Sequence, residues 1–168
     1  MTLFIENSRP PLLILCRWLA KTHIAIFMRD STYAFAIVEM GHLLALAIFG
    51  GAILLVNLRF LNLAFRMQPA SQVAQELLPL TAGGVVATFI SGLFLFLGGA
   101  VRYYHNPAFR LKIVLFLIAL LFHFILQIRT ARQAPVQGNT SLWLKVSAVV
   151  SLLLWFTIGL AGRAVGYV

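Results

Sequence analysis

Residues 31–56 read STYAFAIVEMGHLLALAIFGGAILLV, an apolar run whose only charged or imidazole side chains are Glu39 and His42. A helix of about 20 apolar residues is long enough to cross the roughly 30 Å hydrocarbon core of a bilayer. The run is continuously apolar, whereas a strand of a membrane barrel alternates between apolar and polar positions. It therefore predicts a transmembrane helix.

Three further apolar runs of this length follow along the chain, separated from one another by polar or turn-forming residues. The sequence therefore predicts an all-α fold, an integral membrane four-helix bundle. Because four spans are an even number of crossings, we expect both termini on the same side of the bilayer. The predicted spans cover about 31–56, 81–104, 107–128 and 141–167.

The composition excludes an ordinary soluble domain. Hydrophobic residues make up 61% of the 168 residues and charged residues only 10%, whereas soluble domains are nearer one half and one quarter. The net charge of +9 does not point to nucleic acid, because the Lys and Arg residues cluster at the ends of apolar runs, where they meet lipid headgroups. We therefore expect the lipid bilayer as partner and no nucleic acid. The lone Cys16 excludes an internal disulfide.

The first thirty residues form a separate segment, 1–30, ahead of the bundle of residues 31–168. Its apolar stretch, 11–28, is interrupted by Arg17 and Lys21, which are four residues apart and would share one stripe of a helix. This pattern predicts an N-terminal amphipathic helix in the headgroup layer. A second short interfacial helix is expected around 71–78, in the first connection between spans.

The basic residues also predict the orientation. Eight of them lie on the side of the termini and five on the opposite side, which favours both termini in the cytoplasm by the positive-inside rule. We expect a multi-pass protein of the bacterial inner membrane. The eight are Arg9, Arg17, Lys21, Arg29, Arg102, Arg110, Lys112 and Arg163, and the five are Arg59, Arg66, Arg129, Arg132 and Lys145.

Two predicted spans carry a histidine, His42 in the first and His123 in the third. Counted from Ala34 and Ile113, where the uninterrupted apolar residues begin, they lie about 12 and 15 Å deep at a rise of about 1.5 Å per residue. Two histidines at one depth on different helices suit the axial ligation of a haem iron. The sequence therefore predicts one haem b between His42 and His123.

The other two histidines, His23 and His105, both fall near the interface on the terminal side and could hold a second haem. Arg102, Arg110, Lys112 and Arg163 would be at hand for its propionates, because Arg and Lys suit carboxylates. Glu39, three residues before His42, could accept a hydrogen bond from a ligand histidine. It could also relay a proton or pair with a basic side chain.

Small residues occur at helical spacing in the first two spans. Gly84, Thr88 and Gly92 form one stripe, which suits helix packing better than a flat wall for a macrocycle. Such stripes on so small a bundle also favour a homo-oligomer.

Three stretches carry a family resemblance. They are IVEMGHLLALAIFGGAILLVNLRFLNLA (37–64), YYHNPAFRLK (103–112) and GRAVGY (162–167). They resemble an uncharacterised family of small bacterial four-helix membrane proteins, from about Thr22 onward. Asn57 stands where that family shows the Asp of an Asp-Leu-Arg motif. By architecture alone, the histidines also resemble those of b-type cytochromes of the cytochrome b561 and copper-resistance D kind.

The favoured hypothesis is a membrane b-type cytochrome with one or two haems per chain, exchanging electrons with a quinone or a redox partner protein. Bis-histidine ligation favours electron transfer over oxygen binding, so we expect an electron-transfer protein more than an enzyme, with quinol or small-oxidant redox activity left open. One alternative is a proton-coupled transporter or channel subunit that uses Glu39, His42 and His123. Another is a structural membrane subunit without a cofactor. Copper or zinc on the same histidines is less favoured, because cysteine ligands are missing.

Overall fold

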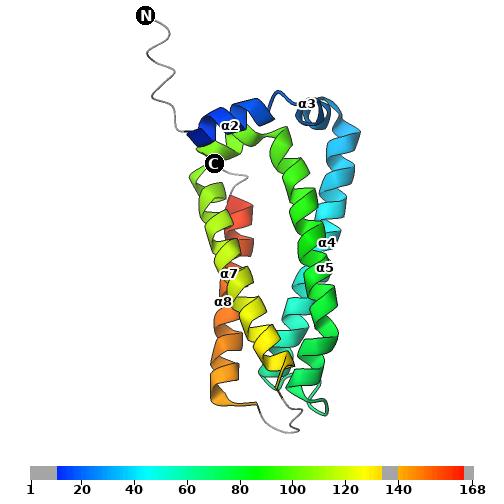
Figure 1. Ribbon diagram of the computed structural model, residues 1–168, viewed down its shortest axis with the longest axis vertical. Coiled ribbons are helices and arrows are strands. Elements are labelled where there is room, and N and C mark those ends of the chain that lie inside the picture. Colours follow the sequence, from blue (N-terminus) through cyan, green and yellow to red (C-terminus); the bar gives the residue numbers. More distant parts are fainter. Residues whose placement is uncertain (1–10, 134–139, 165–168) are drawn as a thin grey trace, which may run out of the picture.

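The computed structural model describes residues 11–133 and 140–164, and the side chains up to residue 162. Four long helices run up and down to form an antiparallel bundle (Figure 1). They are α4 (Thr32–Phe60), α5 (Ala70–Gly98), α7 (Pro107–Ala131) and α8 (Leu142–Ala164).

Each long helix packs against two others in the order α4, α5, α7, α8 and back to α4, so the bundle is four-sided. All four are long and apolar enough to cross a membrane, and the described residues contain no strand. Large apolar side chains such as Leu43, Leu121 and Phe156 point outward and are more than half exposed, a surface that suits lipid and not water. The chain is therefore an all-α, multi-pass membrane protein, as predicted.

Two short helices, α2 (Pro11–Leu19) and α3 (His23–Asp30), lie across one end of the bundle, the end at which α8 also finishes (Figure 1). We call it the terminal end. The predicted single amphipathic helix is thus two helices, bent by 66°. The Thr22 hydroxyl accepts a hydrogen bond from the Ala25 amide and caps α3, which ends the first helix before it. Lys21 therefore lies in the turn and does not share a helical stripe with Arg17.

The short interfacial helix expected around 71–78 is instead the first part of α5, which continues through Pro79. Proline removes one backbone donor and normally ends or kinks a helix. Tertiary packing outweighs this cost, because Val73 and Ala74 are buried and Ala74 packs with Val56 and Phe60 of α4. α5 therefore begins well before the predicted span.

The turn into the third span has the predicted form. After α5 the chain breaks at Gly99, forms the short α6 (Ala100–His105) and turns at Asn106. The Asn106 side chain accepts a hydrogen bond from the Phe109 amide at 3.1 Å, and Pro107 is the first residue of α7. Asparagine before the helix and proline at its first position are strong start signals.

One residue of the predicted small stripe sets the distance between α4 and α5. A Cβ added at Gly84 would lie 2.9 Å from the Cβ of Phe49 and 3.0 Å from its Cα. The backbones therefore approach too closely for any side chain at this position. Gly84 and Thr88 are both buried, so the stripe serves helix packing there, as expected.

Candidate functional site

Polar side chains from all four long helices meet in one buried layer of the bundle. Each of the five is at most 1% exposed. We call this the polar layer. Its members are Asn57 of α4, Thr81 of α5, His123 and Gln127 of α7, and Ser151 of α8.

Hydrogen bonds tie these side chains across the bundle. The Asn57 amide donates to the Ile53 carbonyl at 2.9 Å and to the Ser151 hydroxyl at 3.2 Å, which joins α4 to α8. The Gln127 amide donates to the Ala74 carbonyl at 3.1 Å, which joins α7 to α5, and lies 3.5 Å from the Thr81 hydroxyl. The hydrogen bonds of the layer therefore join the helices in two pairs, α4 with α8 and α5 with α7.

Four hydrogen-bonding atoms of the polar layer have no partner among the described residues: both ring nitrogens of His123, the Asn57 Oδ1 and the Gln127 Oε1. A buried polar atom without a partner costs about 1–3 kcal/mol. An imidazole beside two amide oxygens offers more acceptors than donors. This arrangement suits a proton on His123, or a small polar molecule such as water that donates hydrogen bonds.

Aromatic side chains separate the polar layer from the terminal end. Phe49, Phe116 and Trp155 pack edge to face, with ring centroids 5.0 to 6.3 Å apart. The Trp155 Nε1 and the nearby Thr88 Oγ1 on α5 are also buried without a partner. Polar atoms therefore continue past the aromatic rings along the inside of the bundle.

His42 lies beyond these rings, toward the terminal end. Its Nδ1 is 2.9 Å from the Ser91 hydroxyl oxygen. That hydroxyl donates to the Ala87 carbonyl at 2.7 Å, so its oxygen is the acceptor and His42 Nδ1 carries the proton. This hydrogen bond fixes the ring and leaves the lone pair on Nε2, the atom that would bind a metal or a proton.

The structure does not bring His42 and His123 to one level. The contact between Phe49 of α4 and Phe116 of α7 places these two residues at one level. His42 lies seven residues before Phe49 and His123 seven residues after Phe116, so at about 1.5 Å per residue the two histidines are roughly 20 Å apart along the bundle. The predicted depths matched because each was counted from its own apolar run, which does not give the register of one helix against the other. One haem iron between these two rings does not fit this separation.

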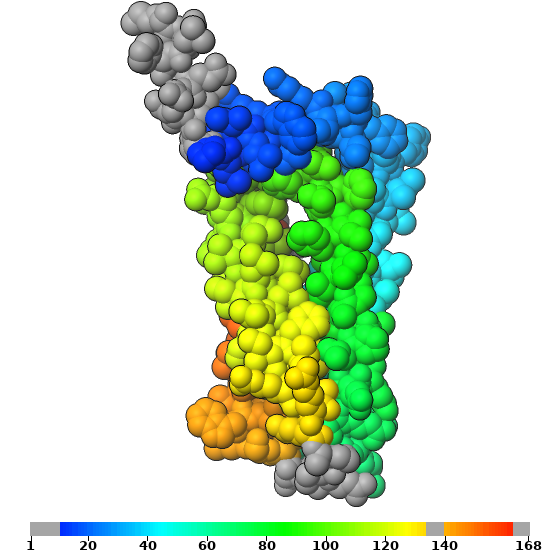
Figure 2. All heavy atoms as spheres, viewed as in Figure 1, coloured from blue at the N-terminus to red at the C-terminus, as the bar shows by residue number. Residues whose placement is uncertain are grey.

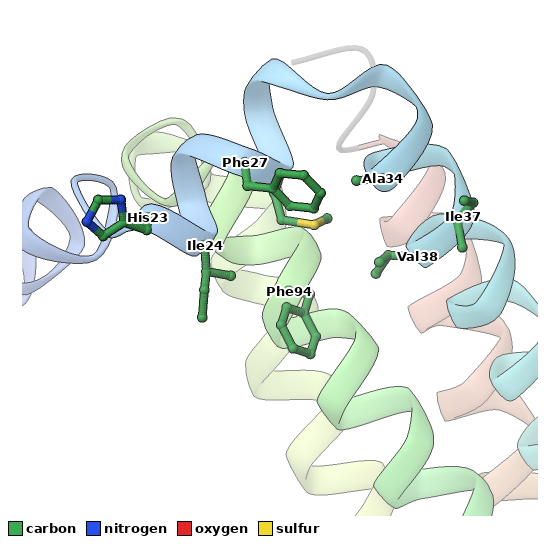
Figure 3. Close-up of a pocket in the computed structure, with 8 residues that line it drawn as sticks. His23, Ile24, Phe27, Ala34, Ile37, Val38 and Phe94 are labelled. Carbon is green, nitrogen blue, oxygen red and sulfur yellow. The ribbon is translucent and has the colours of Figure 1, made fainter.

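His23 and His105 are also apart from any shared site. Both are exposed, and no described hydrogen bond or ring contact joins them. His23 is the first residue of α3 and lies at the rim of an apolar groove of about 570 Å³ between α3, α4 and α5, lined at its centre by Phe27, Val38 and Phe94. Figure 3 shows its ring turned away from Phe94.

The remaining predicted site residues lie around the terminal end. Arg102 and Arg110 are exposed, and Arg102 stacks over the Tyr103 ring. Glu39 is exposed on α4, one turn before His42, and its charge acts on that ring. Lys112 is half-buried and lies against Gly162 of α8. The side chain of Arg163 lies outside the described part of the chain.

Sequence reasoning missed a buried cation at the opposite end. Arg59 is fully buried in the last turn of α4, where its guanidinium donates to the Gln68 carbonyl and the Asn62 Oδ1, both at 2.7 Å. It also missed Asn57, Thr81, Gln127 and Ser151 as a group. Gln127 lies four residues after His123, which was the one available signal, because that spacing places both on one face of the helix.

The chain belongs to a family of unknown function, DUF6644, whose profile matches residues 17–168. This membership agrees with the predicted resemblance to an uncharacterised family. No curated protein and no solved structure matches the chain.

Proposed function

We propose that this protein conducts protons through the interior of its bundle, as a proton channel or as a proton-coupled transporter subunit. The observation that carries the proposal is the polar layer, in which a fully buried histidine lies beside the Gln127 side chain and, within the described part of the chain, has no hydrogen bond of normal geometry at either ring nitrogen. Ionisable groups inside a membrane are costly, so they mark proton or ion pathways more often than structure.

His123 is the residue proposed to carry the proton. The side chains of α4, α5 and α8 that belong to the polar layer are uncharged; they are the amide and hydroxyl groups of Asn57, Thr81 and Ser151. Once protonated, the ring would donate from both nitrogens, and the free oxygens of Asn57 and Gln127 are acceptors of the right kind.

Polar groups on either side of this layer support a path. Toward the terminal end lie Trp155 Nε1, Thr88 Oγ1 and then His42, whose ring is influenced by the charge of Glu39. Toward the opposite end lies Arg59, with one guanidinium nitrogen unpaired. The aromatic rings between the two histidines would act as the gate, because dewetted constrictions interrupt conduction.

The b-type cytochrome is the second candidate, and one observation favours it. The hydrogen bond from His42 Nδ1 to Ser91 is of the kind that orients histidine ligands and leaves Nε2 free. His42 and His123 lie on opposite sides of the aromatic rings, so in this candidate a haem held by His42 would take a second ligand other than the predicted one. A quinone or redox partner protein belongs to this candidate alone.

Orientation and assembly are further proposals. The excess of Lys and Arg on the terminal side supports a cytoplasmic location of that end, in a bacterial inner membrane. Gly41, Gly50 and Gly159 are exposed on the outer surface, with open space where a Cβ would be. Such positions allow close contact between copies, which supports a homo-oligomer.

Proton flux into liposomes tests the proposed function. The purified protein would be reconstituted with a potassium gradient, and flux would be started with valinomycin and followed with a pH-sensitive dye. We expect flux in the wild type and a loss of at least tenfold in His123→Asn, since acid–base groups typically contribute about 10²–10⁴-fold. Asparagine keeps hydrogen-bonding capacity at similar size but does not accept a proton.

His105→Asn is the matched control, because His105 is exposed at the terminal end and should not affect flux. A reduced-minus-oxidised visible spectrum of the same protein separates the two candidates. Flux from a colourless protein supports proton conduction. Sharp haem bands without flux, or unchanged flux in His123→Asn, would overturn the proposal.

A further inference from the structure

Two basic side chains and two glycines share one level of the bundle near the terminal end. His42 of α4 lies against Gly92 of α5, where an added Cβ would be 3.2 Å from the ring Cε1. Lys112 of α7 lies against Gly162 of α8, where an added Cβ would be 3.3 Å from the ammonium nitrogen. Each basic group therefore extends over a backbone that has no side chain.

The two basic groups belong to α4 and α7. These helices lie at opposite corners of the four-sided bundle, because each of them packs against both α5 and α8. The charge of Lys112 nevertheless acts on the His42 ring, so the two groups are near enough to interact. Figure 2 shows an opening through the molecule at this end, between α5 in green and the start of α7 in yellow-green, beneath α2. The bundle therefore has a hollow at this end.

The hollow is positively charged. Lys112 is the sixth residue of α7 and half-buried, and within the described residues no carboxylate forms an ion pair with it; the ion pair described is Arg29 with Asp30, on the surface. Glu39, the nearest acid on α4, is exposed. An ammonium turned into a low-dielectric interior is costly unless an anion accompanies it.

We propose that this hollow binds a small monovalent anion, a halide or a monocarboxylate, between the Lys112 ammonium and a protonated His42 Nε2. The Nδ1–H is already engaged with Ser91, so the proton arriving on Nε2 provides the donor that points to the anion. One Lys charge matches one negative charge, and the opening between α5 and α7 provides the space for the ligand (Figure 2). The other groups that face His42 are Ser91 and Thr88 of α5 and Glu39 of its own helix.

This site is independent of the polar layer, so it can be tested without any measurement of flux. Bromide and acetate would be titrated into detergent-purified protein, with binding followed by the broadening of the bromide signal and of the acetate methyl signal in NMR. We expect saturable broadening that strengthens as the pH falls from about 7 to 5, because protonation of the imidazole supplies the second donor to the anion.

Lys112→Gln removes the charge at similar length and should weaken binding at least tenfold. Lys112→Arg keeps the charge and should bind. Lys145→Gln, a change at a half-buried lysine in the first turn of α8 at the other end of the bundle, should behave as wild type. Gly92→Leu should also abolish binding by filling the hollow, and circular dichroism would check that each variant is folded.

Broadening by either probe, lost in Lys112→Gln and retained in Lys145→Gln, supports the proposal; the probe that binds tells a halide site from a carboxylate site. No saturable broadening in the wild type, or equal binding by folded Lys112→Gln, would overturn it.

Discussion

Adding one methyl group at Gly84 should push α4 and α5 apart, whereas the same change at Gly83 should not. The Cβ added by Gly84→Ala would lie 2.9 Å from the Cβ of Phe49, 3.0 Å from its Cα and 3.2 Å from its backbone nitrogen. Unstrained carbon atoms prefer about 3.5–4.0 Å. At Gly83, the preceding and exposed residue, an added Cβ meets nothing within 4 Å.

The comparison of the two alanine variants isolates the free-energy cost of the close contact with Phe49. Both substitutions gain about the same helix propensity, roughly 1 kcal/mol for alanine over glycine, so this gain cancels between them. Overpacking a tight contact costs about 1–3 kcal/mol, and because the atoms met are backbone and Cβ of Phe49, no side-chain rotation relieves it. We expect Gly84→Ala to be less stable than Gly83→Ala by about 1–3 kcal/mol, which is roughly 5- to 150-fold in the folding equilibrium.

Unfolding by SDS in mixed micelles, followed by circular dichroism, would measure the difference in the free energy of unfolding. Gly83→Ala should equal or exceed the wild type. Equal unfolding midpoints for the two alanine variants would refute the close approach of α4 and α5 at Gly84, and with it the packing of the small stripe.

Three more predictions concern stability and reactivity. Arg59→Lys should lower the free energy of unfolding by about 1.5–3 kcal/mol, because lysine does not reproduce the two hydrogen bonds of the guanidinium; a loss below about 0.5 kcal/mol would contradict that role. Gln127→Met should cost about 1 kcal/mol in the same assay by removing the donor to Ala74, and an unchanged midpoint would count against that hydrogen bond. Burial raises the pKa of the Cys16 thiol, so less thiolate is present at neutral pH and maleimide should label it more slowly than glutathione. Its rate should rise in SDS and continue to rise with pH beyond the ordinary thiol pKa, whereas labelling as fast as glutathione at neutral pH would exclude a buried Cys16.

The four spans and the turn between the second and third were predictable because they depend on local properties. Apolar runs of sufficient length have to cross the bilayer as helices, whatever their partners. The start of α7 is specified by two adjacent residues, Asn106 and Pro107, through capping and a fixed backbone angle. Family membership likewise rests on the linear sequence.

The candidate sites were decided by tertiary structure, because they depend on the register between helices. The apolar runs do not give the register of α7 against α4, and the contact of Phe49 with Phe116 places His42 and His123 roughly 20 Å apart along the bundle. Pro79 signals a break, yet burial of Val73 and Ala74 holds α5 together across it. Asn57, Gln127 and Ser151 are far apart in the chain, and none of them stands out by itself. Only packing, set by close contacts such as Gly84 on Phe49, brings them around His123.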